Sequence, residues 1–259
     1  MGLKRHLVAC SLALLATAQS HSASAGQSFA SCAYRYSLEN WNVNEHTVPV
    51  EIYEPSPAGT YPLVFMLHGS AGAFSVGLAE EPRRDNFGEK TLAQACFVVV
   101  FPHYLEGIGR KSLTSPVEMK ADFPRLMDVT GTLLDRAEEI PSVRLEPVFI
   151  FGDSLGGYLG IALTLSRSEV AAVSEISGGK PEGYGLERRG KPSVLISHGA
   201  DDTLVPPSEA KALEHYCSEH GIPAIRDLYP GEGHYLSQRM EKQILTRTIE
   251  IFRSCGRKH

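Results

Sequence analysis

The sequence predicts an α/β protein with a mostly parallel, twisted sheet of eight strands, helices on both faces and no large lid. Short apolar runs alternate along the chain with amphipathic segments, the pattern of parallel strands joined by helices. The 259 residues, 42% of them hydrophobic, can bury one sizeable core. No internal repeat is apparent, and no linker rich in proline or serine divides the chain. We therefore expect a single domain over residues 26–259.

Residues 1–25 have the features of a signal peptide. A basic pair, Lys4-Arg5, precedes the apolar stretch 7–18, and small residues up to Ala25 offer a cleavage site. The apolar stretch is too short for a convincing membrane span. We expect cleavage near Ala25 and export to the periplasm or the extracellular space, without stable membrane insertion. A lipid attached to Cys10 is the alternative.

The apolar periodicity predicts eight strands and five helices. The first two strands are expected to be antiparallel. The strands are expected near residues 34–39, 47–53, 61–67, 97–101, 147–151, 171–177, 192–198 and 224–229. The helices are expected near residues 86–95, 118–138, 155–167, 207–220 and 237–253. The one plausible insertion, residues 178–191, is too short for a helical lid, so we expect a site open to solvent.

A serine at a strand-to-helix turn is the first candidate for chemistry. The stretch 152–157 contains Gly-x-Ser-x-Gly and lies between the apolar run 147–151 and the helix-period segment 158–167. Such a turn strains the serine backbone and lifts its hydroxyl clear of the sheet, while the glycines let strand and helix cross. Ser154 is therefore a candidate nucleophile. A glycine-rich connection that only packs the helix on the sheet is the alternative.

A serine nucleophile needs a base that takes its proton and an acid that orients the base. The strand near 192–198 ends in a polar turn with two candidate acids, Asp201 and Asp202. His234 follows the last strand in a loop that contains glycine. The chain order Ser, Asp, His is the one expected on a sheet of this type. Taken singly, the acids also fit a turn cap, and the histidine also fits an ordinary surface residue.

An oxyanion hole is expected from backbone N–H groups at two places. One donor is Leu155, directly after Ser154. The second is Ser70 or Ala71, in the small-residue loop that follows the strand 61–67. An ordinary glycine turn is the alternative for this loop.

Three further residues are predicted near the same edge of the sheet. His103 and Tyr104 follow the strand near 97–101 and are candidate substrate-binding residues. Glu175 could tune His234 or bind substrate, but a buried, hydrogen-bonded structural acid is favoured. No His, Cys or carboxylate cluster has metal-ligand spacing and no nucleotide fingerprint occurs, so neither a metal nor a cofactor is expected.

Together these segments resemble the α/β-hydrolases and, more narrowly, the dienelactone hydrolase family. In the pattern His-Gly-x-x-Asp-x-x-Val-Pro of these hydrolases, the acid falls on Asp202 and not on Asp201. The resemblance thus implies an α/β-hydrolase fold with a Ser154, Asp202 and His234 triad. The family's namesake uses a cysteine where this chain has Ser154, so a serine esterase is implied and the namesake lactone is not. The likeness extends from about Tyr61 to the C-terminus and rests on segments 66–72, 99–104, 152–158, 175–179 and 198–206.

These residues predict two-step acyl transfer on a small-molecule ester or lactone. His234 would remove the proton from Ser154, the serine would attack the carbonyl, and water would release the acid. An acyltransferase with an alcohol acceptor, a small-peptide serine peptidase of the same fold and a non-catalytic exported binding protein are the alternatives. The sequence indicates no oligomeric state.

Charge and cysteine content complete the sequence-based expectations. Without residues 1–25 the chain has 23 basic and 30 acidic residues, a net charge of about −7, so no nucleic-acid partner is expected. Four cysteines then remain, an even number for an oxidising compartment. We prefer the pairs Cys32–Cys96 and Cys217–Cys255, because the first would staple the N-terminal strand and the helices of the second both follow late strands. Four free buried thiols are the alternative.

Overall fold

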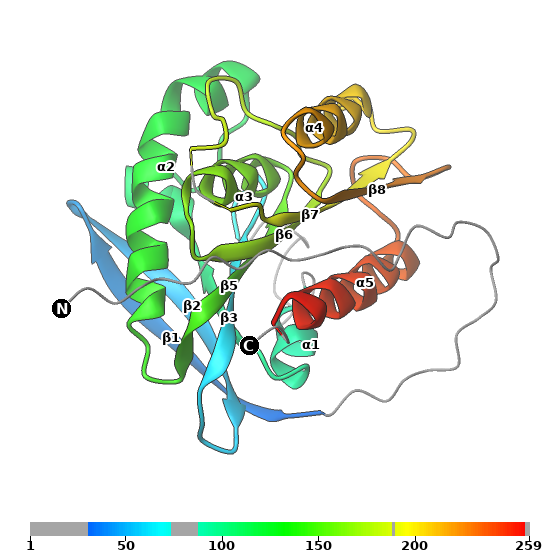
Figure 1. Ribbon diagram of the computed structural model, residues 1–259. Helices are drawn as coiled ribbons and strands as arrows, with labels where there is room; N and C mark the ends of the chain where they lie inside the picture. Colours follow the sequence, from blue (N-terminus) through cyan, green and yellow to red (C-terminus); the bar gives the residue numbers. More distant parts are fainter. Residues whose placement is uncertain (1–30, 74–87, 188–189, 257–259) are drawn as a thin grey trace.

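The computed structural model describes residues 31–73, 88–187 and 190–256. The predicted signal peptide and Cys10 lie outside these residues. Within them, one sheet has eight strands in the order β1-β2-β4-β3-β5-β6-β7-β8 (Figure 1). The strands are β1 (Ala33–Val43), β2 (His46–Ser56), β3 (Tyr61–Leu67), β4 (Val98–Pro102), β5 (Val143–Asp153), β6 (Val170–Ile176), β7 (Ser193–Gly199) and β8 (Ala224–Tyr229).

The first two strands pair antiparallel, as predicted, and β2 joins β4 in the same sense. All pairs from β4 through β3 and β5 to β8 are parallel. Every residue of β6 and β7 is buried, which explains why these strands have apolar residues on both faces. The carboxyl ends of the parallel strands therefore meet at one edge of the sheet.

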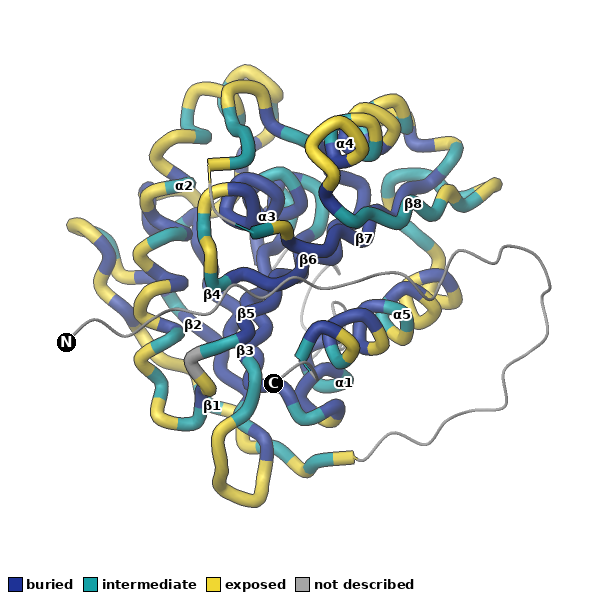
Figure 2. Tube along the Cα trace, viewed as in Figure 1, coloured by how far each residue is buried: buried dark blue, intermediate teal, exposed yellow. Residues whose placement is uncertain are grey.

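Helices cover both faces of the sheet (Figure 1). One core packs the sheet against α2, α3 and α4, and a second packs it against α1 and α5. Figure 2 shows α2, α4 and α5 buried toward the sheet and exposed on their outer sides, whereas α3 is buried almost throughout. None of the described helices combines the length and apolarity needed to cross a membrane. The helices are α1 (Glu89–Gln94), the 3₁₀ helix η1 (Tyr104–Ile108), α2 (Pro116–Glu138), α3 (Leu155–Ser166), α4 (Ser208–Glu219) and α5 (Gln238–Gly256).

The main differences from the predicted elements are three longer strands, β1, β2 and β5, and one added helix. β1 continues to Val43, because its polar residues alternate with buried ones up to the turn at Asn44. β5 begins at Val143, which pairs with Tyr61 ahead of the apolar run. The short helix η1 was not predicted. Its five residues are too few to show a helical period.

The two predicted disulfides have different outcomes. Cys32 and Cys96 are bonded and tie the start of β1 to the segment between α1 and β4, as predicted. The Cys217–Cys255 pairing is wrong, because Cys217 is a free, buried thiol. Cys217 packs in the core under α4, and Cys255 packs in the core under α5 on the other side of the sheet. The sheet therefore lies between the two sulfur atoms.

Loss of the Cys32–Cys96 bridge should lower the free energy of unfolding by about 4 kcal/mol, because the bonded residues are 64 positions apart and the cross-link restricts the unfolded chain. Chemical denaturation of Cys32→Ser, purified without reductant, measures this loss. Cys96→Ser and the double variant should lose the same amount, since each removes the same bond. A double variant clearly less stable than either single variant would contradict this account.

Candidate active site

Ser154 occupies a strained turn between β5 and α3. Its backbone has φ 52° and ψ −116°, a conformation that non-glycine residues rarely adopt. The turn is tight on both sides. A Cβ atom at Gly152 would lie 2.3 Å from the carbonyl oxygen of Gly156, and one at Gly156 would lie 2.1 Å from that of Leu67. Only glycine fits at these two positions, so the Ser154 side chain stands out from the end of the sheet.

The three predicted triad side chains meet at this turn. The Nε2 atom of His234 is 3.1 Å from the Oγ atom of Ser154. The Nδ1 atom of His234 is 2.8 Å from the Oδ2 atom of Asp202. With its proton on Nδ1, the imidazole donates a hydrogen bond to the carboxylate and accepts one from the serine hydroxyl. The loops after β7 and β8 bring Asp202 and His234 to the turn after β5.

Asp202 is held by several donors besides His234. Its Oδ1 atom accepts the backbone N–H groups of Leu204 and Val205, each at 2.9 Å. The Nε2 atom of the buried His198 lies 3.3 Å from its Oδ2 atom and 2.9 Å from the carbonyl oxygen of Val205. The neighbouring Asp201 is exposed instead. The sequence reasoning did not single out His198, although it lies in the pattern that selected Asp202.

The small-residue loop after β3 lies against the nucleophile turn. A Cβ atom at Gly69 would be 3.4 Å from that of Ser154, so the loop backbone runs beside the serine side chain. Leu155 is the first residue of α3, and the first N–H groups of a helix have no partner within it. The oxyanion-hole assignment of Leu155 with Ser70 or Ala71 stays a prediction.

The predicted substrate-binding residues lie inside the protein. The Tyr104 ring stacks on His68 at 4.2 Å between ring centroids, and its hydroxyl donates to the His68 carbonyl oxygen at 2.7 Å. Burial lowers the pKa of His68 to about 3, so this imidazole is neutral at physiological pH. The His103 Nε2 atom is 3.0 Å from the Oε1 atom of the buried Glu51. Direct substrate contact by His103 and Tyr104 stays a prediction.

Two carboxyl groups beside the nucleophile turn have raised pKa values. Desolvation raises the pKa of Glu175 to about 8 and that of Asp153 to about 6. The Oε2 atom of Glu175 accepts the Gly178 N–H group at 2.8 Å, and its Oε1 atom has no hydrogen-bond partner among the described residues. Glu175 is thus buried and hydrogen-bonded, as the sequence reasoning favoured, and is largely protonated at neutral pH.

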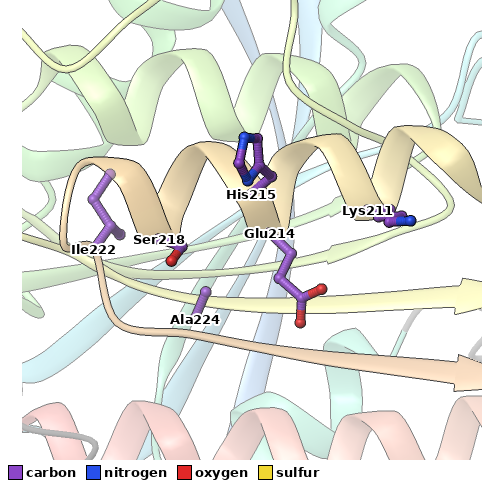
Figure 3. A pocket seen from close by; sticks show the side chains of 6 residues that line it. All are labelled: Lys211, Glu214, His215, Ser218, Ile222 and Ala224. Carbon is purple, nitrogen blue, oxygen red and sulfur yellow. The ribbon is translucent and has the colours of Figure 1, made fainter.

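An open pocket of about 550 Å³ between α4 and β8 contains none of the predicted site residues (Figure 3). Glu214 at its wall pairs with Arg226, and His215 pairs with Glu219. In the described part of the chain, no three His, Cys, Asp or Glu side chains gather in a way that could hold a metal ion. The lining residues of the pocket are Lys211, Glu214, His215, Ser218, Ile222 and Ala224.

A mostly parallel sheet with a serine at the turn after β5, and Asp and His in the loops after β7 and β8, defines an α/β-hydrolase. The sequence profile of the dienelactone hydrolase family matches residues 52–247. The chain belongs to this family and is a hydrolase that acts on ester bonds.

Individual relatives agree with this assignment. The carboxylesterase SOBER1 of Arabidopsis thaliana is 26% identical over 204 residues, 70% of this chain and 86% of the relative. A dienelactone hydrolase-like promiscuous phosphotriesterase, P91, from metagenomic libraries has a TM-score of 0.71 at 18% identity and covers 86% of this chain and 99% of its own. Est1E from Butyrivibrio proteoclasticus has a TM-score of 0.62 at 16% identity, with coverages of 85% and 99%. The two structures share the fold.

Glu175→Gln should make the stability less sensitive to pH. Because the folded pKa is about 8 against an ordinary 4.5, the stability that this carboxyl group contributes is complete below about pH 4.5 and is lost as pH rises to about 8. Between pH 5 and pH 8 the free energy of unfolding of the wild type should fall by on the order of a few kcal/mol, and that of the variant should not show this fall. Urea denaturation across this range measures the difference.

The matched control is Glu250→Gln, an exposed carboxyl group on α5. Its pH profile should follow that of the wild type. Equal pH slopes for the wild type and Glu175→Gln would show that the buried carboxyl group does not drive the dependence.

Proposed function

We propose that this protein is an exported serine esterase that cleaves carboxylic esters or lactones through Ser154, His234 and Asp202. One observation carries the proposal. A continuous hydrogen-bond path runs from the Ser154 hydroxyl through both nitrogen atoms of His234 to the Asp202 carboxylate. Such a path gives a serine hydroxyl the base and the oriented acid that it needs to act as a nucleophile.

The reaction proceeds in two acyl-transfer steps. His234 Nε2 takes the proton of Ser154 Oγ as this oxygen attacks the carbonyl carbon, and Asp202 stabilises the imidazolium that forms. The N–H groups of Leu155 and of Ser70 or Ala71 hold the negative charge on the tetrahedral intermediate. The imidazolium then protonates the leaving alcohol. Water, activated by the same imidazole, releases the acid from the acyl-enzyme.

The substrate class follows from the nucleophile and the family. The namesake reaction of the family relies on a cysteine, whereas position 154 is serine. A relative that covers most of this chain is named a carboxylesterase, which supports a small-molecule ester as the substrate. His103 and Tyr104 remain the proposed substrate-binding residues, and Tyr104 stacks on His68 just ahead of the loop that carries Ser70.

Export is proposed on two grounds. Residues 1–25 have the charged start, apolar stretch and small-residue end of a signal peptide, with cleavage near Ala25. The bonded pair Cys32 and Cys96 fits a protein that folds in an oxidising compartment. The mature enzyme then works in the periplasm or outside the cell.

Ser154→Ala should lower kcat for small activated esters by a factor on the order of 10⁴ or more, because no other group takes over the nucleophilic attack. Thermal unfolding of the variant should resemble that of the wild type. A fluorophosphonate probe should label the wild type at residue 154 and leave the variant unlabelled. Undiminished turnover by a folded Ser154→Ala variant would overturn the proposed mechanism.

The neighbouring aspartates provide a matched pair of variants. Asp202→Asn should lower kcat by a factor on the order of 10³ to 10⁴, because the amide no longer favours the required tautomer of His234. Asp201→Asn should stay within about twofold of the wild type, because the Asp201 side chain is exposed. Steady-state kinetics on one ester measure both. A larger loss in Asp201→Asn would reassign the acid.

A further inference from the structure

We propose that Ser177 is a positioning residue that sets the orientation of His234 toward Ser154, an inference that rests on the proposed function. Ser177 is fully buried and directly follows β6. Its hydroxyl donates a hydrogen bond to the backbone carbonyl oxygen of His234, with 3.2 Å between the oxygen atoms. It therefore holds the main chain of the residue whose side chain must reach the nucleophile.

The end of β6 carries both partners of the proton transfer. The carbonyl oxygen of Ile176 accepts the backbone N–H group of Ser154 at 2.8 Å. The next residue, Ser177, contacts His234 through its hydroxyl, and its own N–H group donates to the Ser197 carbonyl oxygen at 2.9 Å. Two consecutive residues of one strand end thus fix the nucleophile and the base. The end of β6 therefore sets the distance between Ser154 and His234.

The backbone of Ser177 gives an independent reason to assign its hydroxyl a role. Its φ is 52°, in the left-handed region where glycine is favoured over other residues. Two of the other non-glycine residues with positive φ have side chains with a specific role, since Cys96 forms the disulfide and Ser154, also at φ 52°, provides the candidate nucleophile. A serine at a backbone position that favours glycine indicates that its side chain has a structural or functional role.

Further hydrogen bonds hold the loop on either side of His234. The Asp201 N–H group donates to the Glu232 carbonyl oxygen at 2.9 Å. The Glu232 carboxylate accepts the Ser237 N–H group at 2.7 Å and the Ser237 hydroxyl at 2.6 Å. These bonds fix the path of the loop, whereas Ser177 acts on residue 234 itself. Even a small rotation there displaces Nε2, and a shift of about 1 Å can cost on the order of 100-fold in rate.

Ser177→Gly and Ser177→Thr separate positioning from stability. Glycine relieves the positive φ and removes the hydroxyl, so the variant should be at least as stable as the wild type but have a kcat about tenfold lower. KM should stay within about twofold, because substrate contacts are unchanged. Threonine keeps the hydroxyl at a position unfavourable for a branched side chain, so its melting temperature should fall while kcat stays near that of the wild type.

Two controls make the result decisive. Ser177→Ala removes the hydroxyl without relieving the backbone, and it should reproduce the low kcat of the glycine variant. Ser218→Ala removes a hydroxyl from an exposed site on α4, away from the His234 loop, and its kcat should be unchanged. Full kcat in folded Ser177→Gly, or kcat that follows melting temperature across the set, would overturn the proposal. Failure of the triad itself would appear separately, as an active Ser154→Ala variant.

Discussion

The backbone conformation at Ser154 is the constraint on which the site depends. Ser154 has a positive φ although it carries a side chain. Strand β5 and helix α3 cross so closely at this turn that only glycine fits at 152 and at 156. The same closeness brings the loop after β3 against Ser154. One tight crossing thus presents a hydroxyl at the edge of the sheet with the loop after β3 beside it.

Parallel strands supply the second requirement, which is convergence. Because β5, β6, β7 and β8 are neighbours that point the same way, the segments that leave their carboxyl ends are adjacent in space. Ser154 and His234 are 80 residues apart in sequence but are joined by a hydrogen bond. The strand between the nucleophile and the acid, β6, carries no predicted triad member. It contributes instead through Ile176, whose carbonyl oxygen accepts the Ser154 N–H group, and through the next residue, Ser177, whose hydroxyl donates to the His234 carbonyl oxygen.

Burial explains the electrostatics around this edge. Glu175 is buried in the sheet and accepts one hydrogen bond, from the Gly178 N–H group, so desolvation favours its neutral form. Asp202 is also buried, and its carboxyl group accepts the N–H groups of Leu204 and Val205 and lies 2.8 Å from the Nδ1 atom of His234. Two buried carboxyl groups of one protein thus have different surroundings, because Glu175 accepts one N–H group and Asp202 accepts several.

The sequence by itself determined the class of fold and the residue types of the site. Buried parallel strands leave apolar runs, and a Gly-x-Ser-x-Gly turn leaves fixed glycine spacing, so Ser154 and His234 could be predicted from local pattern. The resemblance to the family then selected Asp202 over Asp201. Only the tertiary structure decided the disulfide pairing and the orientation of some site residues, because both depend on the side of the sheet on which a segment lies. Cys217 and Cys255 fall on opposite faces and cannot pair, and His103 and Tyr104 turn inward. The hydrogen bond from Ser177 to His234 joins residues 57 positions apart, and no local pattern records such a contact.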